Sequence, residues 1–332
     1  MDPLTHTATG WFLNKAGLGR LTPQGPVILL LAANAPDIDI VTTFGGSLTY
    51  LEYHRHLTHA LLSLPLMAFL PVLLVRLVSR RPVRWLPAFL IAAVAVATHL
   101  ALDATNIYGI RLLLPFSSYW FSLDTTPVVD IWIWAACALA LLGPLIARLV
   151  NQEIGATFPR GHAPGRGFAL FALLFLVLYN GGRAVLHQRA VATMDARLYN
   201  GSPPLRVAAF PDPFQPFRWR GVAETPAFFA LADLNLLGQF DPGEARILYK
   251  PQASPALTAA ASAPAIRGFL GFAQWPFWRA LPAAEPENGT LVEVFDLRFS
   301  APPDRAFVAD ALLSNRFEVV KSSFHFGATR PR

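Results

Sequence analysis

The chain of 332 residues is 54% hydrophobic and 14% charged, with a mean hydropathy of +0.41 and a formal net charge of +6. This composition excludes an ordinary soluble domain, and no basic-aromatic module of the nucleic-acid-binding kind is visible, so we assign the basic residues to anionic lipid headgroups. The single cysteine, Cys137, excludes an internal disulfide framework and a four-cysteine metal site.

The first 35 residues predict a short helical hairpin. Residues 4–18 and the apolar segment 27–35 are its two arms, and the second is shorter than the roughly 20 residues of a bilayer span. We therefore expect a re-entrant or interfacial helix there. No basic leader with a following apolar run and cleavage site is evident, so no removable signal peptide is expected.

Four later segments are long and apolar enough to cross a bilayer. They cover about residues 60–78, 85–102, 128–150 and 168–186. The sequence therefore predicts a mainly α-helical membrane bundle of about four transmembrane helices plus the N-terminal hairpin. Residues 1–186 are expected to form this membrane-embedded metal-site domain.

The composition changes from residue 187 onward, where proline, glycine and charged residues become frequent. Hydrophobic residues alternate over 290–299 and 316–326, which indicates strands of a half-buried antiparallel sheet. Residues 251–264, rich in Ala, Pro and Ser, predict a loop with at most a short helix. Residues 187–332 are therefore expected to form an antiparallel, β-rich extramembrane domain.

The basic residues predict the orientation of the chain in the membrane. Two loops are rich in arginine, and they carry Arg76, Arg80, Arg81 and Arg84 after the first span and Arg148, Arg160 and Arg166 after the third. By the positive-inside rule these loops face the cytoplasm. The opposite ends of the spans, and the C-terminal domain, are then expected on the outer face.

Residues able to bind a metal lie at the ends of the apolar segments. The candidates are His6, Asp37, Asp39, His54, His59, His99 and Asp103. His54 and His59 precede the first span, and His99 and Asp103 close the second. Because successive spans are antiparallel, these residues lie at the same end of the bundle, away from the arginine-rich loops. His99 and Asp103, four residues apart, share one helix face. Imidazole and carboxylate ligands suit zinc, manganese or iron, and we expect a divalent ion, with zinc first.

Each motif has a structural alternative. His6 can be a surface or packed residue, and Asp37-Ile38-Asp39 can form a turn and helix cap. The histidines at 54, 56 and 59 can be an interfacial polar cluster, and His99 with Asp103 can be a hydrogen-bonded pair. Asp124 is better explained as a cap, whereas Asp130 is harder to dismiss inside an apolar span.

The order of these motifs resembles the YdjM-like bacterial inner-membrane proteins, described as membrane-bound metal-dependent hydrolases. The resemblance covers roughly residues 1–135, and its matching residues are His6, Pro36-Asp37-Ile38-Asp39, His54-Arg55, Thr58-His59, His99, Asp103, Tyr108-Gly109, Leu112-Leu113-Leu114-Pro115-Phe116-Ser117 and Asp130. His56 and Ala60 depart from the family's usual Gly and Ser. The extra His56 leaves open whether it or His54 joins the metal shell.

The resemblance implies a membrane-bound metal-dependent hydrolase. A partial likeness in ligand order to zinc phospholipase C and P1-type nucleases points to a phosphoester or ester in a lipid or lipid-linked substrate. Arg55, which can bind a carboxylate or phosphate, and Asp130 are the expected catalytic residues. The structural alternatives for Arg55 are a headgroup anchor and a salt bridge to Asp37.

Two other functions compete with hydrolysis. A non-enzymatic membrane protein could use a structural metal site and bind a partner through its outer domain. A cation transporter is disfavoured because few ionisable residues lie at mid-span.

Overall fold

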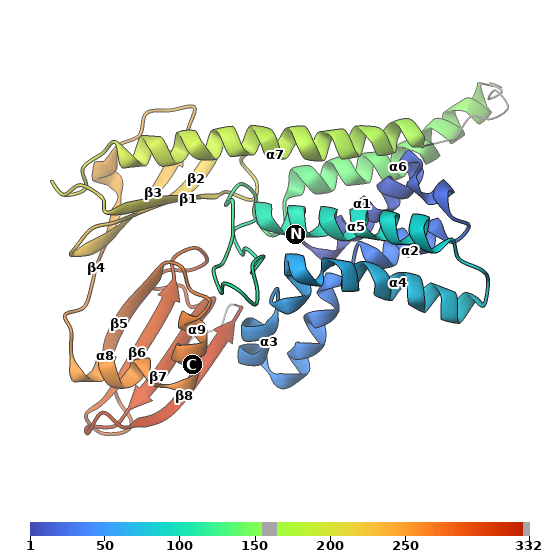
Figure 1. The fold of residues 1–332 in the computed structure, drawn as a ribbon. Helices are drawn as coiled ribbons and strands as arrows, with labels where there is room; N and C mark the ends of the chain where they lie inside the picture. The colour runs from blue at the N-terminus through green and yellow to red at the C-terminus, as the bar shows by residue number, and fades with distance from the viewer. Residues whose placement is uncertain (155–164, 328–332) are drawn as a thin grey trace. The chain divides into compact units, whose positions relative to one another are not determined.

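The computed structural model describes residues 1–154 and 165–327, with helices preceding strands along most of the chain (Figure 1). The helices are α1 Pro3–Ala16, α2 Gly25–Ala32, α3 Ser47–Tyr53, α4 Leu64–Ser79, α5 Trp85–Thr105, α6 Ile131–Glu153, α7 Arg166–Asp195, α8 Pro255–Ala261 and α9 Pro264–Leu270. The strands are β1 Arg206–Pro211, β2 Arg218–Glu224, β3 Phe228–Asn235, β4 Arg246–Tyr249, β5 Pro276–Ala283, β6 Gly289–Asp296, β7 Phe307–Leu313 and β8 Val319–Phe326. Two 3₁₀ helices, η2 Pro36–Gly45 and η3 Leu57–His59, carry candidate ligands.

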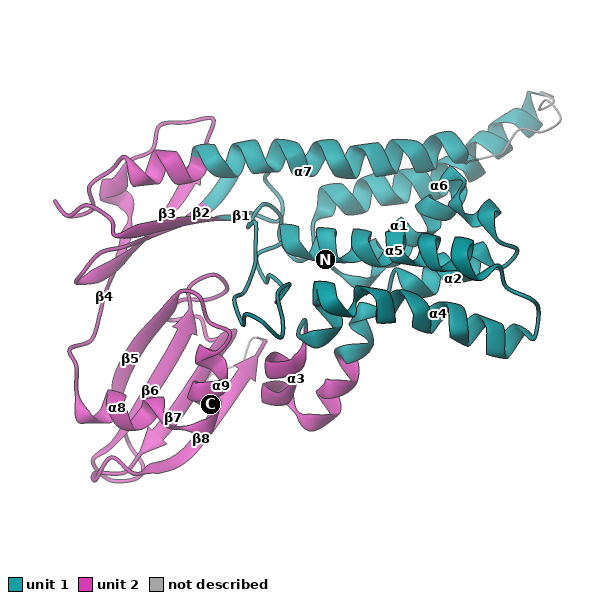
Figure 2. Cartoon of the chain, viewed as in Figure 1, with its two compact units in different colours: residues 1–39, 55–189, 210–219 teal, residues 40–54, 190–209, 220–332 magenta. Residues whose placement is uncertain are grey.

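The chain divides into two compact units, each built from separate stretches of sequence (Figure 2). Unit 1 comprises residues 1–39, 55–189 and 210–219, and unit 2 comprises residues 40–54, 190–209 and 220–332. Unit 1 holds most of the helices, and unit 2 holds most of the strands. The simple boundary that the sequence suggests between residues 186 and 187 stays a prediction.

The four predicted spans are confirmed among the described residues as helices long and apolar enough to cross a membrane. They are Leu61–Ser79, Trp85–Thr105, Ile131–Glu153 and Arg166–Asp195. Helix α2 and η2 together pass the same test but are bent by 48°, as in a broken span or a re-entrant loop. Arg160 of the second arginine-rich loop lies outside the described residues.

A stripe of small residues on α5 explains how two ligand candidates come to face the interior of unit 1. Ala88, Ala92 and Ala95 are buried, and His99 and Asp103 continue their spacing of three or four residues along the same helix face. The alanines pack in one core with residues of α2 and α4, among them Ile28, Leu29, Met67 and Val72. Small side chains let helices approach closely in membranes, so the stripe directs the polar pair into the bundle.

Helix α1 lies against α2 at a glycine. A Cβ atom added at Gly10 would meet Ala33 Cβ at 2.8 Å and the Leu29 carbonyl oxygen at 2.9 Å. Any larger residue there would push the two helices apart. The short N-terminal helical hairpin predicted from sequence is therefore formed by α1 and α2, with backbones in close contact.

The strands form two four-stranded sheets, in the orders β1-β2-β3-β4 and β5-β6-β7-β8, and the second sheet lies wholly in unit 2. The second sheet is antiparallel throughout, and its strands β6 and β8 occupy the two segments predicted from alternation. Helices α8 and α9 pack on it, with Phe269 of α9 contacting Phe307 and Phe324. The short helix allowed in residues 251–264 is α8, and the predicted combination of a helical bundle with C-terminal antiparallel sheets is confirmed.

Candidate metal centre

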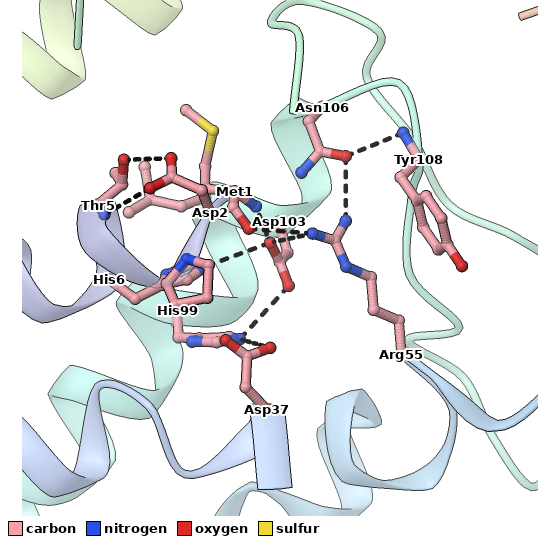
Figure 3. Close-up of polar contacts among 12 residues, drawn as sticks. Met1, Asp2, Thr5, His6, Asp37, Arg55, His99, Asp103, Asn106 and Tyr108 are labelled. Carbon is pink, nitrogen blue, oxygen red and sulfur yellow. Dashed lines mark hydrogen bonds and ion pairs between the residues drawn. The ribbon is translucent and has the colours of Figure 1, made fainter. Parts of the chain in front are cut away.

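Four side chains of unit 1 converge at the inner ends of η2, η3 and α5. They are Asp37, His59, His99 and Asp103, and each offers one ligand atom within 4.8 Å of the others. Figure 3 shows Asp37, His99 and Asp103 directed toward one another. The side chains of His59, His99 and Asp103 are fully buried, whereas that of Asp37 is 17% exposed. Asp37 therefore marks the edge at which the cluster meets its surroundings.

Five separations within the cluster fall in a narrow range. His59 Nε2 lies 3.2 Å from Asp103 Oδ2, 3.2 Å from His99 Nε2 and 3.6 Å from Asp37 Oδ1. His99 Nε2 lies 3.3 Å from Asp103 Oδ2 and 3.6 Å from Asp37 Oδ1. Ligand atoms about 2.0–2.2 Å from a tetrahedral zinc ion are roughly 3.3–3.6 Å apart. The five separations that involve an imidazole are close to this range, and the two carboxylates offer oxygens within 4.8 Å of each other.

A carbonyl group orients His99. Its Nδ1 lies 2.7 Å from the carbonyl oxygen of Ala33, and because that oxygen can only accept, Nδ1 carries the proton. In the neutral imidazole the lone pair is then on Nε2, which faces the other three ligand atoms. The hydrogen bond to Ala33 thus fixes the tautomer that binds a metal.

A carboxylate orients His59 in the same way. Asp39 Oδ2 lies 3.3 Å from His59 Nδ1, and it also accepts from the backbone N–H of Arg55 at 2.8 Å and from the Thr58 hydroxyl at 2.9 Å. Asp39 is therefore placed behind the imidazole and outside the converging set. This is the carboxylate–histidine arrangement that commonly supports a metal ligand.

The charge around His59 favours a cation. Burial lowers the pKa of its imidazole, but hydrogen bonds to Asp103, Asp37 and Asp39 outweigh burial and raise the pKa to about 10. The surroundings that hold a proton on this ring can equally stabilise a divalent ion. A metal and a proton compete for Nε2.

Two carboxylate oxygens at the cluster have acceptor capacity to spare. Among the described residues, the buried Asp37 Oδ2 has no hydrogen bond of good geometry, and the neighbours of the buried Asp103 Oδ2 are the Nε2 atoms of His59 and His99, at 3.2 and 3.3 Å. Unsatisfied buried acceptors are costly unless a proton or cation contacts them. With two imidazole nitrogens and two carboxylates, the donor set fits a divalent metal ion.

The second oxygen of Asp103 is neutralised from the opposite side. Arg55 Nη2 lies 3.0 Å from Asp103 Oδ1, His6 Nε2 lies 3.3 Å away, and the amino group of Met1 also contacts it. Figure 3 shows the Arg55 guanidinium and the His6 ring flanking Asp103. Asp103 therefore joins a cationic side to the metal-binding side of the site.

Arg55 is held rigidly and is only 3% exposed. Its guanidinium donates to Asn106 Oδ1 at 3.0 Å and to the Gly109 carbonyl at 3.4 Å, and it lies 4.9 Å from the centre of the Tyr108 ring. The expected contact with substrate stays a prediction. The structural alternatives for Arg55 were a headgroup anchor and a salt bridge to Asp37. Arg55 does form a salt bridge, but its partner is Asp103.

His6 lies beside the converging set. Its ring stacks on His99 with ring centroids 3.7 Å apart, and it is 1% exposed. Burial, followed by the charges of His99 and the N-terminus, lowers its pKa to about 3, so the imidazole is neutral at physiological pH. Neither ring nitrogen has a hydrogen bond of good geometry among the described residues. His6 supports His99 and Asp103, and its predicted ligation stays a prediction.

Two predicted site residues have other surroundings. His54 ends α3 in unit 2 and stacks on Tyr50, one helical turn earlier, at 4.4 Å between ring centroids. Asp130 caps α6, accepting from the N–H groups of Trp132 and Ile133 at 2.9 and 3.2 Å and from the Tyr179 hydroxyl at 2.9 Å. Neither belongs to the converging set, and their predicted roles are untested.

Asn106 is a site residue that the sequence reasoning did not select. Its Oδ1 accepts from Arg55 and from the backbone N–H of Tyr108 at 2.9 Å, which ties the guanidinium to the segment after α5. Its position three residues beyond Asp103, where α5 ends, was the available signal. The Ala33 carbonyl, a backbone group, has no signature in the sequence.

Comparison with known proteins gives two family matches along the chain. The sequence of the YdjM inner membrane protein family matches residues 1–190, and that of the YfhP C-terminal alpha/beta plait domain matches residues 255–329. A protein of Bacillus subtilis (strain 168), described as uncharacterized protein YfhP, is 27% identical over 156 residues. The match covers 42% of this chain and 45% of that relative, less than half the length of either. No solved structure gives a significant match.

Proposed function

We propose that this chain, which belongs to the family of YdjM inner membrane proteins, is a membrane-bound hydrolase dependent on a divalent metal ion, zinc in the first place. Asp37, His59, His99 and Asp103 are the proposed ligands. The substrate is an ester or phosphoester of a membrane lipid or a lipid-linked molecule. The observation that carries the proposal is the convergence of two imidazole nitrogens and two carboxylates, with ligand atoms within 4.8 Å of one another in a largely buried cluster.

Each residue around the cluster has a defined task in this proposal. Ala33 and Asp39 hold the protons of His99 and His59 on Nδ1, which leaves both Nε2 atoms available. Arg55 fixes Asp103 and keeps its charge balanced inside the protein. A divalent ion bound there would lower the pKa of a coordinated water and stabilise negative charge on the scissile group.

Asp37 is the proposed entry side because its side chain alone among the four ligands is partly exposed. A water or a substrate oxygen can approach from that edge, while the buried histidines and Asp103 exclude water elsewhere. Its Oδ2 has no hydrogen bond of good geometry and can accept a proton from an approaching water. We assign Asp37 this second role beside ligation.

We place the cluster and the C-terminal domain on the outer face of the membrane. Support comes from Arg76, Arg80, Arg81 and Arg84, which mark the opposite end of the first two spans as cytoplasmic. Cysteines introduced at Ser118 and Ser202 of a Cys137→Ala chain should both react with an impermeant maleimide added outside. Labelling from opposite sides would show this arrangement to be wrong.

A structural metal site is the second candidate function. It is favoured by the number of protein ligands, because four of them would fill the four positions of a tetrahedral zinc ion, whereas catalytic zinc sites commonly keep one position for water. In that function the metal holds η2, η3 and α5 together, and the outer domain binds a partner. Metal removal would then destabilise the fold without any associated hydrolysis.

The deciding experiment combines metal analysis with substrate screening on protein purified in detergent. We expect about one zinc ion per chain and hydrolysis of a phosphodiester or carboxylic ester lipid that chelation abolishes and zinc restores. His99→Ala should lose both. A metal-loaded protein with no activity on either lipid class would support the structural site, and a protein that binds no divalent metal would overturn both functions.

A further inference from the structure

A groove of about 530 Å³ runs along unit 1 between α1, α2 and α6, separate from the cluster. Leu4, Ala8 and Trp11 line it from α1, at helical spacings of four and three residues. Trp134, Ala138 and Leu141 line it from α6 with the same spacings. Seven residues of helix extend about 10 Å, so the groove is a slot parallel to both helices.

The lining of this groove is suited to hydrocarbon. The two polar side chains in it are already hydrogen-bonded: the Thr5 hydroxyl donates to Asp2 Oδ2 at 2.7 Å, and the Thr7 hydroxyl to the Pro3 carbonyl at 2.8 Å. The remaining lining is aliphatic or aromatic apart from the Cys137 thiol. Since α6 is a membrane span, the medium around the groove is lipid, and its volume is in the usual range of ligand sites, roughly 300–1,000 Å³.

The groove begins at the level of the cluster. The Trp134 indole donates to Asp2 Oδ2 at 3.0 Å, which places the first turns of α1 and α6 side by side. His6 lies between Leu4 and Ala8 in sequence but points to the opposite side of α1, toward His99. Leu4, at the start of the groove, and His6, which faces the cluster, are two residues apart, a rise of about 3 Å along α1. The cluster and the start of the groove therefore lie at nearly the same level along this helix.

A hydrogen bond connects the groove to the exposed edge of the cluster. The hydroxyl of Thr7, which lines the groove, also lies 3.1 Å from Asn34 Oδ1 and shares its single proton between this oxygen and the Pro3 carbonyl. Asn34 lies in the short turn that leads from α2 to Asp37. Asp37 is the partly exposed ligand. A molecule with its polar end at Asp37 can therefore continue along the groove with an apolar tail.

We propose that this groove binds a hydrocarbon chain of the membrane lipid whose ester or phosphoester is presented to the metal cluster. The lipid's identity as the substrate rests on the proposed function. The groove's preference for a hydrocarbon chain rests on its lining alone. The chain lies between α1 and α6, and the headgroup lies at the Asp37 edge.

Photocrosslinking tests this proposal without requiring activity. The full-length protein is reconstituted in vesicles of phosphatidylethanolamine and phosphatidylglycerol that include a phosphatidylglycerol with a diazirine at the end of one acyl chain. We expect crosslinks at Leu4, Trp11 and Leu141 several-fold above those at Leu139 and Leu142, which are 52% and 54% exposed on α6 but do not line the groove. Equal labelling of all these positions would overturn the proposal.

A pair of matched variants on α6 provides the control. Ala138 and Ala135 are both exposed alanines of this helix, and only Ala138 lines the groove. Ala138→Trp should fill the slot and remove the excess crosslinks, whereas Ala135→Trp should leave them unchanged. Thermal stability and metal content, measured on both variants, identify a fold defect. Persistence of the crosslinks in a stable Ala138→Trp protein would refute the groove.

The results also separate this inference from the proposed function. If the protein binds no divalent metal but the crosslinks depend on Ala138, the groove stands and the hydrolase proposal fails. If metal and hydrolysis are present while labelling is uniform, the hydrolase stands and the groove fails. With both in place, Ala138→Trp should raise KM for long-chain lipids more than for a soluble short-chain ester.

Discussion

Asp39 Oδ2 lies 3.3 Å from Nδ1 of His59, the ring nitrogen opposite the one that faces the cluster. The carboxylate therefore acts on the metal site through the imidazole, by fixing its orientation and its proton. Because Asp39 also accepts from the Arg55 backbone and the Thr58 hydroxyl, its position is set by the same turn that carries His59.

Asp39→Asn should weaken metal binding without removing it. An amide keeps the size of the side chain but supports the imidazolium or metal-bound imidazole less well, and loss of such a partner lowers metal affinity by about 10–100-fold. Competition titration with a metal-binding dye would measure the affinity at fixed pH. An unchanged affinity would mean that Thr58, 3.0 Å from the same ring nitrogen, orients His59 on its own.

His59→Ala and His99→Ala should each abolish stoichiometric metal binding, because each removes one of four ligand atoms and no replacement lies in the converging set. His54→Ala is the matched control. Its ring stacks on Tyr50 in unit 2, so metal content should stay at the wild-type level. Elemental analysis of the three purified variants provides the comparison, and metal loss in His54→Ala would return that residue to the ligand set.

Arg55→Ala should destabilise the protein by about 3–5 kcal/mol, since it leaves the buried Asp103 carboxylate without its guanidinium partner. Arg55→Lys keeps the charge but cannot reproduce the contacts with Asn106, Gly109 and Asp103 together, so its stability should be intermediate. Thermal unfolding in detergent measures both. A lysine variant with normal stability but no hydrolysis would indicate the contact with substrate that the sequence predicts.

The stability of the metal-free protein should fall as the pH rises from about 6.5 to 10. The pKa of His59 in the folded protein, about 10, lies above the ordinary value of 6.5. Protonation of His59 therefore stabilises the fold fully below pH 6.5, and this stabilisation is lost by pH 10. Metal affinity should increase over the same window because the proton leaves Nε2. Unfolding temperatures with and without chelator, compared between wild type and His59→Gln, would show it. A flat profile for the metal-free wild type contradicts this.

Two substitutions can decide whether Asp130 acts as a helix cap or as a catalytic residue. Asparagine is also a good N-cap, so Asp130→Asn should keep stability, metal content and hydrolysis. Asp130→Ala should lose about 0.5–2 kcal/mol, the usual effect of a lost cap. Denaturant or thermal unfolding together with the activity assay separates the roles. Loss of hydrolysis in Asp130→Asn at full metal content would support the catalytic role predicted from sequence.

The helical part of the fold was predictable because its signals are local. Runs of about 20 apolar residues identify the spans. The i, i+4 spacing of His99 and Asp103 is enough to place both on one helix face. The alternation in β6 and β8 likewise depends on neighbouring residues only.

Other features could not be read from the sequence because they depend on contacts between distant segments. Residues 40–54 belong to unit 2, where the Ser47 hydroxyl donates to the Phe324 carbonyl at 3.2 Å across 277 residues. Asp37 joins the converging set, whereas Asp39 orients His59 from behind. This difference depends on the 3₁₀ geometry of η2, which places Asp37 near Nε2 and Asp39 near Nδ1 of His59. His54 was grouped with His59 by proximity in sequence, but the break between α3 and η3 directs it elsewhere.

The glycine contact between α1 and α2 gives the packing of these helices an influence on acid–base chemistry. Ala33, against which Gly10 packs, is the residue whose carbonyl holds the proton on His99 Nδ1. Gly10→Val should displace that carbonyl and let the ring adopt its other tautomer, which ¹⁵N NMR of the histidines can detect. The hydrogen atom that stands in place of a side chain at Gly10 thus helps to set which imidazole nitrogen of His99 is basic.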